Sequence, residues 1–409
     1  MKFYNKIFWL YLFAIVPLLG SVLDLFSVIS PLSVDLIGII LKDVPIILLI
    51  LFSLNTSIKN IKNENILFIF LITIYFLISI LWNDKNNTVL TIIAAMRNEI
   101  LYPCIYLAAY KVGLESKLSE GPPFRIFVIS LIINLIMGIL QQFNLIDSPY
   151  KDLRSLGGGD ESFIWIHGGM NSYIEFSFYL SFSIMIIAIL INKLLISSIL
   201  KATIKIVFIL FSLELIVASQ SRLGLLIYFI AVLGVFIRDR IATFYIVIIL
   251  LLSFFYYDIF GMQIDLNHRI MDFNGSDPRF DIIYPNAIDL IEKKFIFGYG
   301  LGSYGPASIF SEGVYNSIDY IDSSFLSISL QFGLFGLILY ILFISINFYR
   351  ILQKSLQLKK YDIALLNFIL ALITIIYSIF FNFTNAWPGS ILIFCWLGYI
   401  NIKLKNLLI

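Results

Sequence analysis

The chain has 409 residues, of which 60% are apolar and only 13% are charged, and its mean hydropathy is +0.95. A soluble domain is typically about 45–50% apolar and about 25% charged. The composition therefore excludes an ordinary soluble protein and predicts a polytopic membrane protein, while the net charge of +2 gives no indication of a nucleic-acid partner.

Long apolar segments follow one another from one end of the chain to the other. A membrane-spanning helix needs about 20 mostly apolar residues, and twelve segments approach this length. The sequence therefore predicts an all-α polytopic membrane protein that forms a single integral membrane domain over residues 1–409. The predicted spans are 7–23, 36–54, 66–82, 88–110, 124–146, 171–191, 203–219, 222–237, 242–259, 323–349, 361–383 and 387–402.

The distribution of lysine and arginine predicts the orientation, because cytoplasmic loops carry an excess of both. With the N-terminus inside, every predicted cytoplasmic segment holds at least two of these residues. Twelve spans then place both termini in the cytoplasm and two long polar loops, 147–170 and 260–322, on the periplasmic side. The larger loop is expected to carry short amphipathic helices.

Metal and redox chemistry find little support in the sequence. Cys104 and Cys395 lie in apolar runs and are expected to pack in the core. The chain has no Cys-x-x-Cys, no His-x-x-x-His and no Asp-x-Asp or Glu-x-Asp sequence, which are common patterns of metal ligands. The prediction is a protein with neither a resident metal nor a cofactor.

Several ionisable residues fall inside the predicted spans. Each costs about 2.5–3.5 kcal/mol at a helix centre, so such groups normally face the bundle interior and pair with one another. Their spacing excludes partners on the same helix, and the sequence does not assign partners on other helices. These residues are Lys42, Asp43, Arg97, Glu99, Glu175 and Glu214.

Ser221-Arg222-Leu223-Gly224 lies at the predicted outer junction between spans 203–219 and 222–237. The very short connection leaves Arg222 at the membrane surface, where a guanidinium group can bind phosphate through two hydrogen bonds. The alternative is an arginine that extends to the interface without binding a ligand.

A second arginine, Arg279, precedes an amphipathic stretch that runs to Phe295. Pro285 predicts either a kink in this helix or its start, and the helix is expected to lie along the membrane surface. It would place Arg279 over the mouth of a cavity, although a solvated loop charge is the simpler alternative. The residues predicted on its apolar face are Phe280, Ile283, Tyr284, Ala287, Ile288 and Ile291.

Two further motifs follow in the same loop. Four glycines between Gly298 and Gly305 allow backbone conformations that expose N–H groups to a phosphate or a sugar; a simple turn is the alternative. Asp322 lies directly before span 323–349, where it could cap the helix or act as a general base.

Taken in this order, the motifs between Ser219 and Gly336 resemble those of the bacterial O-antigen polymerase (Wzy) and O-antigen ligase superfamily. The resemblance covers less than a third of the chain. It rests on Ser221-Arg-Leu-Gly, Arg279, Gly298-Tyr-Gly-Leu-Gly-Ser, Asp322-Ser-Ser-Phe-Leu and Gly333-Leu-Phe-Gly336.

The resemblance implies roles for individual residues. In the family, outer arginines hold the diphosphate of a lipid-linked sugar donor, a role that falls on Arg222 and Arg279 here. Ligases typically carry a histidine where this chain has Asp322, which favours a polymerase in which Asp322 orients or deprotonates the acceptor hydroxyl. Arg154, in loop 147–170, is a further candidate for binding the substrate. Gly300, Gly302 and Tyr304 complete the predicted substrate-binding residues.

The activity that the resemblance implies is metal-independent glycosyl transfer on the periplasmic side of a bacterial inner membrane. Repeat units linked to undecaprenyl diphosphate would be polymerised into O-antigen or a related surface polysaccharide. The implied partners are this lipid-linked oligosaccharide and membrane lipid, together with a separate chain-length regulator and a flippase. The alternatives are an O-antigen ligase and a lipid-linked oligosaccharide flippase or other transporter. The long outer loop favours an enzyme over a flippase.

Overall fold

In the part of the chain that it describes, the computed structural model contains helices joined by turns and irregular segments, and no strands. The described residues are 3–18, 34–59, 64–83, 88–116, 122–143, 145–146, 173–192, 194–219, 221–238, 279–305, 321, 323–381 and 389–408. The chain divides into two compact units. The first comprises residues 1–16, 30–127 and 276–409, and the second comprises residues 17–29 and 128–275.

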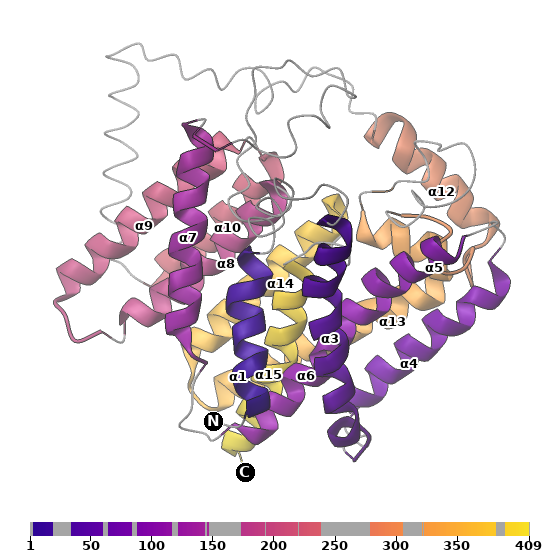
Figure 1. The fold of residues 1–409 in the computed structure, drawn as a ribbon, viewed down its shortest axis with the longest axis horizontal. Helices are drawn as coiled ribbons and strands as arrows, with labels where there is room; N and C mark the ends of the chain where they lie inside the picture. The colour runs from indigo at the N-terminus through magenta and orange to yellow at the C-terminus, as the bar shows by residue number, and fades with distance from the viewer. Residues whose placement is uncertain are drawn as a thin grey trace. The chain divides into compact units, whose positions relative to one another are not determined.

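The first unit contains both ends of the chain and most of the helices (Figure 1). Its helices begin where the sequence provides a start: Thr88 caps α5 by accepting a hydrogen bond from the Thr91 amide, and prolines occupy the first turns of α6 and α12. The elements are α1 (Phe3–Leu10), η1 (Tyr11–Ile15), α3 (Val34–Lys59), α4 (Glu64–Ile78), η3 (Ser79–Trp82), α5 (Val89–Met96), η4 (Arg97–Leu101), α6 (Tyr102–Glu115), η6 (Arg279–Ile283), α12 (Tyr284–Lys293), α13 (Ser324–Gln357), α14 (Tyr361–Phe380) and α15 (Gly389–Leu408).

Helix α6 forms the centre of the first unit, packed between α15 and α3. Two glycines allow α6 and α15 to approach closely. A Cβ atom on Gly113 would lie 2.1 Å from Ile402 Cγ2, and one on Gly398 would lie 2.5 Å from the Tyr106 carbonyl oxygen. Small residues have this role in membrane bundles because they let helix backbones come into contact. Helix α13 packs against α14, α15 and α4.

The second unit is built around α8 (Tyr173–Asn192), which packs against both α9 (Ser198–Ala218) and α10 (Arg222–Arg238). Helix α7 (Phe124–Gln142) begins in the first unit and continues into the second. Its Gly138 faces Phe176 of α8 and Leu215 of α9. The side chain of Ser197 caps α9 by accepting a hydrogen bond from the Leu200 amide.

The helices follow the predicted spans. Every predicted span except 242–259 overlaps a described helical run, and 242–259 lies outside the described residues. The described part of the chain is therefore that of a multi-pass membrane protein, while the number of twelve spans stays a prediction. Six described helical runs are long and apolar enough to cross a membrane: Leu41–Lys59, Glu64–Trp82, Phe124–Gln142, Ile174–Asn192, Ser324–Gln357 and Tyr361–Phe380.

Four of the six charges inside the predicted spans have partners on other helical elements, as the cost of burying such groups leads us to expect. In the first unit, Arg97 Nη1 lies 3.7 Å from Asp43 Oδ2, and the Tyr102 hydroxyl lies 3.4 Å from Asp43 Oδ1. The Lys42 ammonium group lies 5.5 Å from the centre of the Tyr102 ring. In the second unit, Gln142 Nε2 of α7 donates to Glu214 Oε1 of α9 at 3.3 Å.

Candidate functional site

The Ser-Arg-Leu-Gly motif forms the start of α10. Helix α9 ends at Ala218 and α10 begins at Arg222, so the predicted tight junction is confirmed. The Ser221 hydroxyl oxygen accepts a hydrogen bond from the Gly224 amide at 2.9 Å, which satisfies one of the free N–H groups at the helix start. Arg222 is the first residue of α10, at a position where the helix dipole favours anions; its side chain lies outside the described part.

The glycine of this motif has a packing role. A Cβ atom on Gly224 would lie 2.5 Å from both Cβ and Oγ of Ser177 on α8. The Ser177 hydroxyl lies 3.3 Å from that of Ser219, just before the motif. Gly224 therefore permits α8 to pack directly against the first turn of α10, which fixes the start of the helix that carries Arg222.

Arg279 opens the segment that leads into α12. It is the first residue of the π-helical turn η6, and Tyr284 then begins α12 with Pro285 in its first turn. Ile283 has helical φ and ψ angles, so η6 and α12 form one helical run, and Pro285 lies just after its change from π-helical to α-helical geometry. The Arg279 side chain lies outside the described part, so its contacts stay a prediction.

The apolar face of α12 is confirmed, with one correction. Ala287 is fully buried in a cluster with Tyr304, Ile321 and Leu330, against which Ile283, Leu290 and Ile291 also pack. Ile288, which was predicted on this face, is instead 50% exposed, so the prediction for this residue was wrong. Ile288 lies about 100° around the helix from Ala287, at the edge of the predicted face, and Leu290 packs against the cluster instead.

The glycine-rich segment has a backbone that only glycine adopts readily. Gly298, Gly300, Gly302 and Gly305 have φ values of 69°, 94°, 83° and 84°. Gly333, in the middle of α13, also has a positive φ, of 65°, with a ψ of −172°, so the helix is broken there. The two glycine motifs that the sequence singles out therefore mark two unusual stretches of backbone.

These two stretches bind each other. At the break in α13, carbonyl groups that end the first half-helix and N–H groups that begin the second lack partners within the helix. The segment after α12 and the side chain of Tyr75 supply them. The hydrogen bonds run from Tyr299 N to Leu330 O (2.7 Å), Gly300 N to Gln331 O (2.8 Å), Leu334 N to Phe295 O (2.8 Å), Phe335 N to Ile296 O (3.3 Å) and Tyr75 Oη to Phe332 O (2.8 Å).

Glycine is needed on both sides of this junction because the two backbones nearly touch. A Cβ atom on Gly298 would lie 2.5 Å from the Gly333 nitrogen, and one on Gly333 would lie 2.2 Å from the Ile296 carbonyl oxygen. Real Cβ atoms do not approach other atoms so closely. The Gly298-Tyr-Gly and Gly333-Leu-Phe-Gly motifs thus form the two halves of one contact.

Gln331 is a residue of this junction that sequence reasoning missed. Its side-chain oxygen accepts a hydrogen bond from the Gly302 amide at 2.8 Å, and its side-chain nitrogen donates to Ser327 Oγ at 3.1 Å. It is 1% exposed. A glutamine two residues before Gly333 in an otherwise apolar helix was the available signal, since polar groups in such a helix need partners.

The amides of Gly300 and Gly302 therefore both donate to Gln331. A substrate-binding role for these glycines stays a prediction, and it would have to use groups other than these two amides. Tyr304 is 5% exposed and belongs to the cluster under α12. Of the predicted substrate-binding residues, the structure brings these three together; Arg154 lies outside the described residues.

The turn η3, which follows α4, and the next residue, Asn83, support the glycine-rich segment from the other side. The Ser79 hydroxyl accepts a hydrogen bond from the Leu301 amide at 3.1 Å, and Asn83 Nδ2 donates to the Leu301 carbonyl oxygen at 2.7 Å. The Trp82 indole N–H donates to the Phe297 carbonyl oxygen at 3.1 Å. Contacts between residues more than 200 positions apart leave no periodic pattern, so the sequence did not reveal them.

Asp322 lies outside the described residues, but its two neighbours are placed. Ile321 is fully buried, and Ser323 occupies the N-cap position of α13. The Ser323 hydroxyl donates to the Ser378 carbonyl oxygen of α14 at 3.3 Å. Ser323 makes no side-chain capping hydrogen bond to α13, and both alternatives for Asp322, a helix cap and a general base, stay predictions.

Comparison with known proteins agrees with the order of these motifs. Residues 206–341 match a family model described as O-antigen ligase. The match runs from within α9 through the start of α10, η6 and α12 into α13 beyond its break. No curated protein matches the chain. The match to the O-antigen ligase family model over residues 206–341 is consistent with the O-antigen ligase/polymerase superfamily that the motifs resemble.

Proposed function

We propose that this protein is a glycosyltransferase that polymerises lipid-linked oligosaccharide repeat units at the outer face of a bacterial inner membrane. The substrates are glycans carried on undecaprenyl diphosphate, and the product is O-antigen or a related surface polysaccharide. The observation that carries the proposal is the family match over residues 206–341, within which Asp322 stands where ligases typically have histidine.

The proposed reaction is one displacement at a sugar carbon. A hydroxyl oxygen of the acceptor attacks the anomeric carbon of the donor glycan, the bond from that carbon to the diphosphate oxygen breaks, and the hydroxyl proton passes to Asp322. Arg222 and Arg279 stabilise the negative charge that develops on the leaving diphosphate. Arginine suits this role because its fixed fork of donors matches phosphate oxygens. Arg154 is a further candidate for contacting the anion.

The geometry of the described residues supports a rigid mounting for the motifs after Arg279. Helix α12 packs on a buried cluster, the glycine-rich segment is hydrogen-bonded into the break of α13, and a hydrogen bond to the Ser378 carbonyl group holds Ser323, the residue after Asp322. Catalytic groups need such support because small displacements reduce rates strongly. The twelve-span topology, with both termini cytoplasmic and this segment periplasmic, is part of the same proposal.

An O-antigen ligase is the second candidate, because the matching family model carries that description. A ligase would transfer the finished glycan to lipid A-core instead of to another lipid-linked unit. The two candidates share the donor, the membrane side and the arginines, and they differ in the acceptor.

A strain that lacks the protein distinguishes the candidates when its surface glycan is resolved on a gel. Loss of a polymerase leaves lipid A-core that carries one repeat unit, whereas loss of a ligase or of a flippase leaves bare core. We expect the single-repeat band. A band of bare core would contradict the polymerase and support a ligase or a flippase. A ladder of normal length would contradict all three hypotheses.

A further inference from the structure

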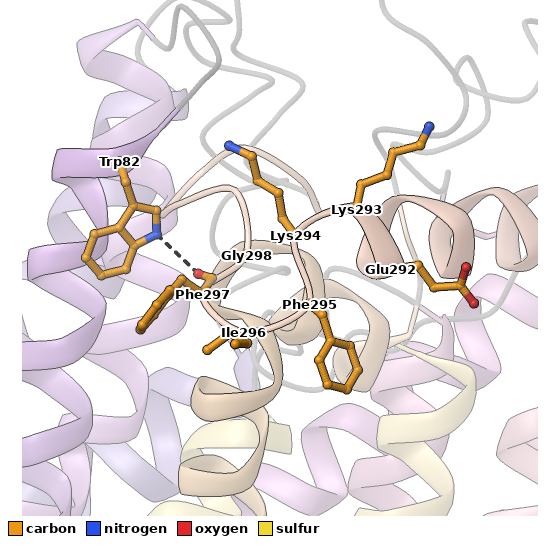
Figure 2. A pocket seen from close by; sticks show the side chains of 8 residues that line it. All are labelled: Trp82, Glu292, Lys293, Lys294, Phe295, Ile296, Phe297 and Gly298. Carbon is orange, nitrogen blue, oxygen red and sulfur yellow. Dashed lines mark hydrogen bonds between the residues drawn. The ribbon is translucent and has the colours of Figure 1, made fainter.

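The end of α12, the segment that follows it and the end of η3 line an open hollow of about 660 Å³. Figure 2 shows its lining as an arc, with the Trp82 indole on one side and the end of α12 on the other. The lining residues are Trp82, Glu292, Lys293, Lys294, Phe295, Ile296, Phe297 and Gly298.

The hollow lies at the end of a candidate membrane span. The helical run Glu64–Trp82 has 19 residues, which is about 28 Å at about 1.5 Å per residue, close to the thickness of the hydrocarbon core. Its side chains Leu71, Ile74 and Leu81 are 46%, 51% and 84% exposed, as expected for a surface that faces lipid. Trp82 therefore stands at the boundary between hydrocarbon and water, where tryptophan is enriched.

Apolar and basic side chains separate around this hollow. Phe295, Ile296 and Phe297 are 50%, 59% and 58% exposed. Figure 2 shows Phe295 and Ile296 pointing to one side of the segment, while the ammonium groups of Lys293 and Lys294 reach to the opposite side. This is the arrangement of an element that inserts apolar groups into a bilayer and keeps its charges at the headgroups.

The backbone of this segment is suited to enter the edge of the membrane. The carbonyl oxygens of Phe295 and Ile296 accept hydrogen bonds from α13, and that of Phe297 accepts one from Trp82. An irregular segment with unpaired carbonyls would be costly there. These bonds also show that the three apolar side chains are held outward by a fixed backbone.

We propose that this hollow binds the headgroup of an anionic phospholipid of the outer leaflet, with Phe295, Ile296 and Phe297 inserted among the acyl chains. Lys293 and Lys294 meet the phosphate, and with Glu292 they leave one net positive charge for a headgroup with one negative charge. The Lys294 ammonium group lies 5.0 Å from the centre of the Tyr299 ring, which helps to position it. The choice of the outer leaflet rests on the topology in the proposed function, whereas binding of an anionic headgroup does not, and the site would fix α12 to the membrane surface.

The test uses the purified full chain in nanodiscs and quenching of Trp82 by brominated lipids. The fluorescence of Trp82 is obtained as the difference in tryptophan fluorescence between the wild type and the Trp82→Phe variant. Dibrominated phosphatidylglycerol should quench this signal about fivefold more strongly than dibrominated phosphatidylcholine at equal mole fraction, because one net charge near an anionic surface gives a factor of about five.

Two sets of variants separate charge from insertion. Lys293→Gln with Lys294→Gln should bring the ratio of quenching by the two lipids to about one and leave quenching by phosphatidylcholine unchanged. Lys359→Gln with Lys360→Gln, a matched pair between α13 and α14, should preserve the fivefold ratio. Phe295→Ser with Phe297→Ser should reduce quenching by both lipids.

Three results would overturn the proposal. The first is absence of quenching by either lipid, since the segment would then be in water. The second is a phosphatidylglycerol preference that survives the double substitution of Lys293 and Lys294. The third is loss of the preference when undecaprenyl phosphate is added at a tenth of the phosphatidylglycerol content, because the hollow would then be a site for the lipid carrier.

Discussion

Gly298 and Gly333 are the residues through which the segment after α12 and the broken helix α13 come into contact. Gly333 combines a φ of 65° with a ψ of −172°, a region that is essentially restricted to glycine. Its neighbour across the junction is main chain, the Ile296 carbonyl group, which cannot move aside as the tip of a flexible side chain can. The cost of a side chain at this point is therefore both conformational and steric.

Gly333→Ala should destabilise the protein by about 3 kcal/mol or more, as the sum of backbone strain and overlap. Thermal unfolding in detergent would measure the loss. Gly138→Ala is the control, since Gly138 lies inside helix α7 and a Cβ atom there would meet the ring edge of Phe176 at 3.1 Å. Alanine is favoured over glycine in a helix, so this variant should unfold close to the wild-type temperature. Equal effects of the two substitutions would contradict the role of Gly333.

Gln331 provides a local test of the same junction. Gln331→Leu leaves the buried Gly302 amide without its acceptor, which costs about 1–3 kcal/mol. We expect faster hydrogen exchange in peptides that contain Gly302. Ser327→Ala is the matched control, because it removes a partner of Gln331 but leaves the bond from Gly302 to Gln331. If exchange at Gly302 is the same in both variants, the glutamine does not hold this segment.

Arg279 tests the proposed chemistry at a single residue. Arg279→Ala should lower the rate of polymerisation by a factor of about 100 to 1,000, as expected for loss of a group that stabilises developing charge, and long glycan chains should disappear from the gel. Arg279→Lys keeps the charge but loses the fork geometry, so shortened chains are expected. Arg125→Ala, at the exposed start of α7, is the control. Normal chain length in Arg279→Ala, with normal amounts of protein in the membrane, would remove Arg279 from the mechanism.

Among the elements, the pair α8 and α10 shows how a motif glycine positions a helix. Gly224→Ala should destabilise the protein by about 1–3 kcal/mol through overlap with Ser177. Ser177→Gly in the same chain should recover about half of this loss, because the Ser221 hydroxyl, 2.8 Å from the built Cβ atom, still crowds it. Unfolding temperatures of the single and double variants measure the coupling. Additive effects would show that the two residues are independent.

The helices themselves were predictable from the sequence because lipid imposes a simple rule on length and polarity. The start of α10 at Arg222 and the apolar face of α12 were predicted for similar local reasons. Ile288 was misplaced because it lies at the edge of the predicted apolar face, about 100° around the helix from the buried Ala287. The break of α13 and its partners could not be predicted, since Gln331, Tyr75 and Trp82 act on residues that are distant in the chain.

For the whole molecule, the outer position of segment 279–305 depends on the number of spans that precede it. Span 242–259 lies outside the described residues, and without it the segment would lie in the cytoplasm. Cysteine labelling decides between the two topologies with little background, because Cys104 and Cys395 are buried. Asp289→Cys, at an exposed position of α12, should react in intact cells with a maleimide that does not cross the inner membrane. Gln357→Cys, at the exposed far end of α13, should react only after the cells are opened. The reverse pattern would place the arginine of η6 on the wrong side of the membrane for a flipped, lipid-linked donor, and the proposed function would fail with the topology.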